Sequence, residues 1–285
     1  KDIAFLPGRP VVQKPRGYGG WPEGDASYAG PNPPSGAVIA YYQKTRHTFG
    51  RMKLEILDAS GRVVDTPPAG KRKGINRVVW SMQEKPPRVP TAAQTAGASN
   101  GPRVLPGTYT VRLTKGSKVV ETPLLVSLDP RAPFTLEDRK AQYDAAMRAH
   151  ALFGRMRDVV DRLNGYRGLA VERSRGLPEG GTLRKDLDAF AAKADAIRKD
   201  IVATSEGGAI TGEERLREHL AHVYDALLSY EGRPGDYQLD RVTALERELK
   251  EVETRAAALA AKDLPALNEK LRARKLAPIA DAAAP

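Results

Sequence analysis

The hydrophobic pattern of this chain changes its period once, at Thr135, and that change limits the folds open to it. Before this point, short apolar runs alternate with Gly- and Pro-rich stretches, which is typical of strands joined by turns. After it, apolar residues recur every three or four positions, which is typical of amphipathic helices. The sequence therefore predicts an α+β multidomain chain, with an N-terminal Ig-like antiparallel β-sandwich followed by an antiparallel bundle of about four helices.

Four parts are expected along the chain. Residues 1–35 are predicted to be an extended arm, because Pro and Gly interrupt every longer run. Residues 36–130 form the sandwich, and residues 131–135, with two prolines, are a stiff connector. Residues 136–285 form the helical bundle and a C-terminal tail.

Within the sandwich, turn chemistry separates short strands. Residues 52–57 alternate in polarity and lead into Asp58 and Gly61, which together predict a hairpin. Trp80 is interpreted as a plug of the sandwich core, and a ligand platform is the alternative. The stretch 86–106 is predicted to be a long mobile loop.

Capping patterns and seams define the helical part. Thr135 followed by Asp138 predicts an N-cap, and Thr211 followed by Glu214 predicts a second capping box that opens the third helix. The connections that contain Gly176–Gly181, Gly207-Gly208 and Gly232–Gly235 look short, so neighbouring helices are expected to be antiparallel. Heptad-like seams cover residues 146–163, 183–201, 216–227 and 242–259.

Charge is placed unevenly along the chain. The net charge is +11, and residues 1–130 hold 19 Lys and Arg against 9 Asp and Glu, whereas residues 131–285 hold 27 against 26. A basic sandwich is a candidate surface for acidic partners, although solubility alone is the simpler explanation. Cysteine is absent, which excludes disulfides and thiolate chemistry. No apolar run is long enough to span a membrane.

Four blocks of the sandwich resemble a known kind of protein region. They are residues 32–42, 54–64, 74–80 and 101–113, and the motif Leu128-Asp129-Pro130-Arg131 follows them. Their order resembles the C-terminal region of exported bacterial proteins with sortilin-like or sialidase-like (Asp-box) β-propellers. The sandwich is also similar to the Ig-like domain of flagellar hook-capping proteins. The resemblance extends through the helices to residues 264–271, and it implies an exported, periplasmic or extracellular protein.

Catalytic and metal-binding motifs are not found in the sequence. His219 and His222 share one face of the third predicted helix, but a metal site needs a third or fourth ligand. There is no nucleophile elbow, phosphate loop or dinucleotide fingerprint. We therefore predict no catalytic residues, no cofactor and no metal, and the protein is not expected to be an enzyme. A glycosidase is the third-ranked reading.

Two sets of residues are candidates for partner binding. The first is the aromatic set of the arm, Tyr18, Trp21 and Tyr28, which can pack on a partner or on its own sandwich. The second is Lys71-Arg72-Lys73, a predicted loop tip that can contact phosphate on lipid head groups, lipopolysaccharide or nucleic acid, or can be a solvated turn. The sequence contains no motif of a known nucleic-acid-binding domain beside this loop tip.

The predicted function is a non-catalytic structural or protein-interaction module. The resemblance implies that it is the C-terminal part or a processed subunit of a larger exported β-propeller protein or envelope assembly, with a propeller chain or envelope subunit as partner. The alternative is a carbohydrate-binding accessory domain of a glycoside hydrolase. That alternative needs at least two exposed, coplanar aromatic rings among Trp21, Tyr41, Tyr42 and Trp80.

Overall fold

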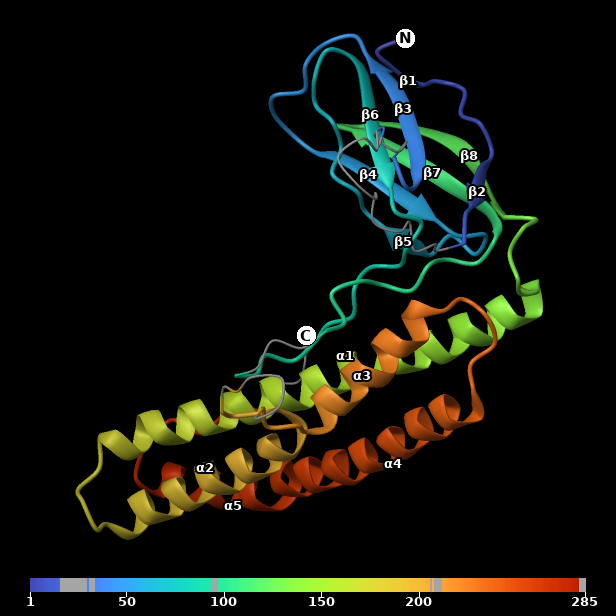
Figure 1. The fold of residues 1–285 in the computed structure, drawn as a ribbon. Helices are drawn as coiled ribbons and strands as arrows, with labels where there is room; N and C mark the ends of the chain where they lie inside the picture. The colour runs from blue at the N-terminus through green and yellow to red at the C-terminus, as the bar shows by residue number, and fades with distance from the viewer. Residues whose placement is uncertain (16–29, 31–33, 94–96, 206, 208–211, 282–285) are drawn as a thin grey trace. The chain divides into compact units, whose positions relative to one another are not determined.

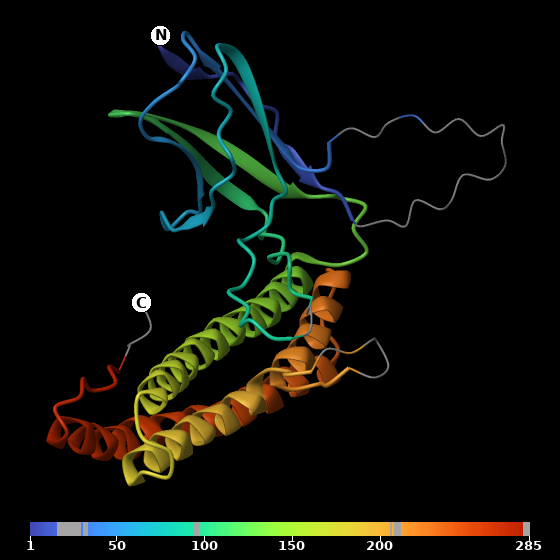
Figure 2. The ribbon, with the colours of Figure 1, turned by 90° about the vertical axis from the view of Figure 1, so that its left-hand side faces the viewer.

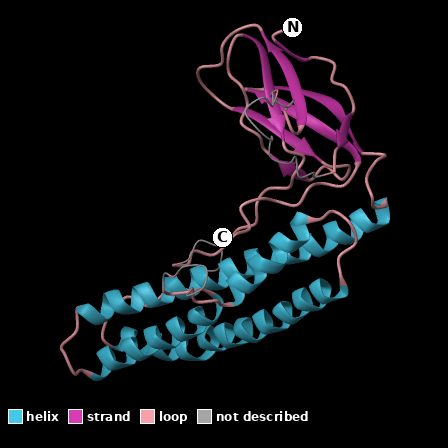
Figure 3. Ribbon diagram, in the orientation of Figure 1, coloured by secondary structure: helices cyan, strands magenta, loops and turns pink. Residues whose placement is uncertain are grey.

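The computed structural model of the chain describes residues 1–15, 30, 34–93, 97–205, 207 and 212–281. These residues form two compact units (Figure 1). The first unit contains Lys1–Pro86, Asn100–Asp144 and Tyr230–Arg233. The second contains Pro87–Ser99, Ala145–Ser229 and Pro234–Pro285. All described strands belong to the first unit (Figure 3), so the predicted fold class, a β-sandwich followed by a helical bundle, is confirmed.

The first unit is a sandwich of two sheets (Figure 2). One sheet has three strands in the order β1-β3-β6, and all of its pairs are antiparallel. The other has five strands in the order β2-β8-β7-β4-β5, in which β2 pairs with β8 in parallel. The strands are β1 (Ile3–Phe5), β2 (Val11–Gln13), β3 (Ala37–Gln43), β4 (Met52–Leu57), β5 (Val63–Asp65), β6 (Gly74–Trp80), β7 (Gly107–Lys115) and β8 (Lys118–Leu128).

The first fifteen residues differ from the expected arm. Strand β1 pairs with β3, and β2 pairs with the last three residues of β8, so this segment adds one strand to each sheet. Short apolar triplets such as Ile3–Phe5 carry too little periodicity to be recognised as strands in isolation. Pro123 is tolerated inside β8 because it precedes the part of that strand that β2 covers.

Alternating residues of the strands fill the space between the two sheets. Trp80 is buried there, its ring lies edge-on to that of Tyr109 at 5.5 Å, and its Nε1 donates to the carbonyl of Gln83. The Tyr109 hydroxyl donates to the carbonyl of Leu105 over 2.7 Å. The interpretation of Trp80 as a core plug is therefore confirmed, because its ring is not available to a ligand.

Helix α1 (Leu136–Arg175) begins at the predicted cap. The Thr135 hydroxyl accepts from the Asp138 backbone N–H, and the Asp138 carboxylate accepts from the Thr135 backbone N–H. This reciprocal pair satisfies two donors that a helix start leaves without a partner. The first part of α1, Leu136 to Asp144, belongs to the sandwich unit, and the rest belongs to the second unit.

The second unit packs helical segments around one continuous apolar core. Connections of six residues make α1 and α2 antiparallel, and likewise α3 and α4, as expected (Figure 1). The segments after α1 are α2 (Thr182–Ile201), α3 (Leu216–Ser229), α4 (Asp236–Ala258), a π-helical turn η1 (Leu259–Asp263) and α5 (Leu264–Ala273).

The prediction that α2 and α3 are antiparallel is wrong. The two helices run in the same sense, one after the other, and both pack on α4 (Figures 1 and 2). The reason lies in the connection, because α3 begins only at Leu216. The Glu213 carboxylate accepts from the backbone N–H groups of Thr204 and Ser205 and so secures the exit from α2 rather than capping α3. The predicted capping box of Thr211 with Glu214 stays a prediction, because Thr211 lies outside the described residues.

A π-helical turn joins α4 to α5. Pro265 lies at the start of α5 and has no N–H to donate to the preceding turn. A π-turn widens the helix at the place where its regular hydrogen bonding is interrupted, so the chain continues without a break. Beyond α5, the Asn268 side chain both donates to and accepts from the backbone of Ile279, which holds the C-terminal tail on the bundle.

The loop predicted to be mobile is part of the bundle unit over its described residues 87–93 and 97–99. Ala98 is buried in the helical core, and Val89 and Ala92 pack against that core. Arg217 donates to the carbonyl of Pro90, and the Ala93 N–H donates to the carbonyl of Ala203. Composition suggested a free loop, but these contacts attach it to the helices.

Candidate functional site

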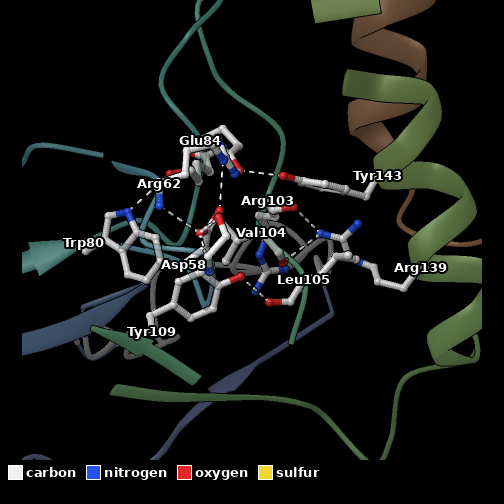
Figure 4. A network of polar contacts seen from close by, with 12 residues as sticks. Asp58, Arg62, Trp80, Glu84, Arg103, Val104, Leu105, Tyr109, Arg139 and Tyr143 are labelled. Atoms are coloured by element: carbon white, nitrogen blue, oxygen red, sulfur yellow. Dashed lines mark hydrogen bonds and ion pairs between the residues drawn. The ribbon is translucent and has the colours of Figure 1, made fainter. Parts of the chain in front are cut away.

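A polar cluster centred on Glu84 connects three segments of the sandwich unit (Figure 4). The buried Glu84 carboxylate accepts from Arg62 Nη1 and Nη2 at 3.0 and 2.8 Å and from the Tyr143 hydroxyl at 2.5 Å. Arg62 Nε also donates to Asp58 at 2.9 Å. The cluster joins the β4–β5 turn, the segment after β6 and the first turns of α1.

Arg139 extends this arrangement along the same part of α1 (Figure 4). It is fully buried, and it donates to Gln142 and to the backbone carbonyls of Arg103 and Val104. Arg103 in turn donates to both carboxylate oxygens of Glu231 at 2.9 Å. Each contact satisfies a backbone, amide or carboxylate oxygen that burial would otherwise leave without a partner.

The electrostatics of the cluster follow from this packing. Hydrogen bonds from Arg62 to Glu84 raise the pKa of Arg62 further above its ordinary value. Burial, followed by the Glu84 hydrogen bond, raises the pKa of Tyr143 well above 10. Burial also raises the pKa of Tyr109 to about 12. The cluster therefore holds neutral phenols and a guanidinium bound to a carboxylate, an arrangement that stabilises the sandwich unit.

The histidines do not form a metal centre among the described residues. His219 and His222 each lie 3.4 Å from a different oxygen of Glu214, on an exposed surface of the bundle. Within the parts of the chain that the structure describes, no group of three or more His, Asp or Glu is placed to hold an ion. The paired histidines are thus carboxylate neighbours on a helix surface.

Of the aromatic candidates that the structure describes, two are buried and one is exposed. Tyr18, Trp21 and Tyr28 lie outside the described residues. Of the other rings proposed for a carbohydrate platform, Tyr41 and Trp80 are buried, and Tyr42 is partly exposed. The Tyr41 hydroxyl donates to the carbonyl of Gly70 at 2.6 Å, so it supports a loop from inside the sandwich. The described residues therefore supply one ring, where the platform needs two.

Lys71, Arg72 and Lys73 form an exposed turn with a fixed backbone, directly before β6. The carbonyl of Lys71 accepts from the His47 N–H at 3.0 Å. The Asn76 side chain accepts from the Arg72 N–H and donates to the Arg72 carbonyl. The three cationic side chains are therefore carried by a turn whose backbone is fixed by hydrogen bonds.

An apolar row crosses the outer face of the three-stranded sheet. Tyr42 of β3 is the register partner of Ile75 of β6, and Val38 is the partner of Val79. Their exposed fractions are 37% for Tyr42, 64% for Ile75, 42% for Val38 and 45% for Val79. Arg77, paired with Ala40, lies between the two apolar pairs. We call these six residues the β3–β6 face.

Sequence reasoning missed the β3–β6 face, although a signal was present. Strand β3 reads Ala-Val-Ile-Ala-Tyr-Tyr-Gln, which is apolar at nearly every position instead of at every second one. Such a run is typical of a strand covered on both faces. The same strand in a two-sheet sandwich leaves one apolar face outward unless something covers it.

Comparison with known proteins gives little guidance. No family model matches the chain, and no curated protein matches it. A solved structure, that of CopC from Methylosinus trichosporium OB3b, aligns with 36% of this chain and 82% of its own length, at 15% identity and a TM-score of 0.21. A likeness this low supports no argument about function. Among the described helices, none combines the length and apolar character that crossing a bilayer requires.

Proposed function

We propose that this chain is a non-catalytic protein-interaction module that docks a partner protein on the β3–β6 face. The observation that carries the proposal is two cross-strand pairs of partly exposed large apolar side chains, Tyr42 with Ile75 and Val38 with Val79, on one face of one sheet with Ala40 and Arg77 between them. Contiguous apolar surface of this kind marks interaction sites on folded proteins, whereas scattered apolar side chains do not. The outward positions of β7 that are not buried, in contrast, carry Thr108, Thr110 and Arg112.

The charge around the face selects the chemistry of the partner. Arg77 lies within the row, and Arg9, Lys14 and Arg103 line the adjoining cleft together with Val38. Two copies of this face would place like charges against each other, which disfavours self-association. The occupant is therefore a different folded protein, with an apolar centre and carboxylates around it.

The finer assignment rests on the sequence resemblance alone. On the basis of that resemblance, we propose that the partner is a β-propeller chain or an envelope subunit. The module would then be part of an exported assembly in the periplasm or outside the cell. The absence of turnover is part of the same proposal, and the Glu84 cluster supports it because its groups are bonded to one another.

Site-specific photo-crosslinking in the native source tests the docking surface. A photoreactive residue at Ile75 is expected to capture one protein, whereas the same residue at the exposed Thr108 on β7 is the control and captures none. The captured protein is identified by mass spectrometry, purified, and its affinity for the full chain is measured. Arg77→Glu is expected to weaken binding at least tenfold, because each carboxylate opposite it then becomes repulsive.

Three results would overturn the proposal. They are equal capture from Ile75 and Thr108, capture of a second copy of the chain, and an affinity that Arg77→Glu leaves unchanged. A measurable glycan turnover by the purified chain would refute the non-catalytic part.

A further inference from the structure

The end of the sandwich at which β3 and β7 end gathers an unusual share of the chain's charge. The pairings of Gln43 with Gly74, Met52 with Lys115, and Lys115 with Lys118 bring three turns together there. Nine of the nineteen Lys and Arg of residues 1–130 lie at this end: Lys1, Lys44, Arg46, Arg51, Lys71, Arg72, Lys73, Lys115 and Lys118. Asp2 is an acid at this end, and Lys115 and Lys118 contact it.

One large apolar side chain stands among these cations. Phe49 lies in the β3–β4 loop and is 90% exposed, the most exposed large apolar side chain among the described residues. The loop that carries it is held at several points: His47 Nε2 donates to the carbonyl of Gly50 at 3.0 Å, and the Gly116 N–H donates to the carbonyl of Arg51 at 2.8 Å. The ring is therefore presented by a fixed loop.

The neighbouring turn is tied to this loop. The His47 N–H donates to the carbonyl of Lys71, so the loop with Phe49 and the turn with Lys71–Lys73 lie side by side. Lys44, Arg46, Arg51 and Lys71–Lys73 have no carboxylate partner among the described residues. We call these six cations and Phe49 the basic tip.

We propose that the basic tip docks the protein on an anionic phospholipid surface, with Phe49 inserted at the level of the headgroups. An anionic leaflet attracts a cluster of cations, and each Lys or Arg near the surface strengthens binding about fivefold. An aromatic ring gains by leaving water for the interface between headgroups and acyl chains. The two gains need a surface that is both anionic and, a few ångströms deeper, apolar.

A nucleic acid is the less suitable occupant. Single-stranded nucleic acids are held by several aromatic side chains that stack successive bases along a basic groove. The basic tip offers one ring at the apex of a loop, and the nearby Tyr41 is buried. This geometry is suited to insertion into a surface, because the ring projects and no second platform accompanies it.

Vesicle flotation with the purified full chain tests the proposal. The probes are vesicles of phosphatidylcholine alone and of phosphatidylcholine with phosphatidylglycerol, and single-stranded DNA is a separate arm. We expect binding to the phosphatidylglycerol vesicles, with little binding at about 1 M salt, where the screening length falls to about 3 Å. Phosphatidylcholine vesicles and DNA are expected to bind weakly.

Matched variants separate charge from insertion. Substituting Lys71, Arg72 and Lys73 by Gln is expected to weaken vesicle binding roughly hundredfold, since each charge contributes about fivefold. The control removes the same number of charges from the bundle by substituting the exposed Arg247, Lys262 and Arg272 by Gln. This control should weaken vesicle binding much less. Phe49→Ser is expected to cost about tenfold. Tyr237→Ser, at a ring that is 75% exposed elsewhere, should cost nothing.

Insertion has a direct spectroscopic readout. In a Phe49→Trp variant, the added tryptophan should shift its emission to the blue on vesicle binding, and brominated lipid should quench it. The wild-type chain, without this tryptophan, is the reference for both changes. Vesicle binding that Phe49→Ser leaves unchanged would overturn the proposal, as would equal losses in the two charge triples. Binding to DNA that depends on Phe49, without binding to vesicles, would assign the tip to nucleic acid instead.

Discussion

Replacing Tyr143 by Phe removes one hydrogen bond from the Glu84 cluster and leaves the ring in place. The bond runs from the Tyr143 hydroxyl to a carboxylate oxygen over 2.5 Å, and the Glu84 side chain is 5% exposed. A hydrogen bond to a charged group contributes about 1.5–3 kcal/mol. The same oxygen still accepts from Arg62 Nη2 at 2.8 Å, so it keeps one partner and the loss falls at the lower end. We expect Tyr143→Phe to lower the free energy of unfolding by about 1.5–2 kcal/mol.

Two spectroscopic probes locate this effect in the sandwich unit. Trp80 is buried in the sandwich and donates to the carbonyl of Gln83, next to Glu84, so tryptophan fluorescence during urea unfolding reports on this unit. Far-UV circular dichroism reports mainly on the helices. The fluorescence transition should move to lower urea, and Tyr237→Phe, at an exposed ring, should move neither signal.

The dependence on pH and on Glu84 makes the prediction stricter. Because the folded pKa of Tyr143 is raised above the unfolded value, the bond contributes fully below about pH 10 and is lost as pH rises through the folded pKa. The difference in unfolding free energy between wild type and Tyr143→Phe should thus be constant from neutral pH to about pH 9 and shrink above it.

In a Glu84→Gln background, the effect of Tyr143→Phe should fall to that of a neutral hydrogen bond, about 1 kcal/mol or less. A loss below about 0.5 kcal/mol, or an equal loss in both backgrounds, would refute the reasoning.

Three further predictions concern other parts of the molecule. A Cβ on Gly101 would lie 1.9 Å from the Glu84 carbonyl oxygen, so Gly101→Ala should lower the fluorescence-detected stability by about 3 kcal/mol, whereas Gly8→Ala, where a Cβ meets nothing within 4 Å, should leave it unchanged. Leu245 is fully buried in the bundle, and Leu245→Ala should cost about 2–5 kcal/mol in urea unfolding followed by circular dichroism. The hydrogen bonds from Arg131 hold the pKa of Asp129 at about 2, so the wild type should lose this stabilisation as pH falls from about 4 to 2, and Asp129→Asn should lack that part of the acid transition in fluorescence-detected unfolding.

The sequence was sufficient where a local pattern decides the structure. The capping pair Thr135 and Asp138 lies three residues apart, and it opens α1 as the pattern indicates. The Asp58-to-Gly61 turn forms because the Asp58 carboxylate accepts from the Ser60 and Arg62 N–H groups, and Gly61 adopts φ +83°. Both features depend on neighbours along the chain, which the sequence displays directly.

Prediction failed where the local structure depends on a partner that is distant in sequence. The stretch 211–214 is predicted to open the third helix, yet Glu213 bonds to the chain after α2, eight and nine residues earlier. Arg62 and Tyr143 lie 22 and 59 residues from Glu84, so no motif spacing could connect them. The loop 87–99 has the composition of a free segment, and its buried Ala98 becomes recognisable only once the helical core is assembled.

The two proposed surfaces differ in a way that makes them separable. The β3–β6 face lies on paired strands, and the cross-strand partners of Tyr42 and Val38 fix its shape. The basic tip lies on loops that project beyond those strands, and its exposed side chains are charged except for Phe49 and small polar residues. Arg77→Glu therefore changes the charge of the face and leaves the six cations of the tip, and Phe49→Ser changes the tip and leaves the apolar row. If a protein held by the face and a membrane held by the tip are engaged together, each substitution should abolish one attachment and preserve the other. Loss of both attachments with either substitution would mean that the two surfaces form a single site.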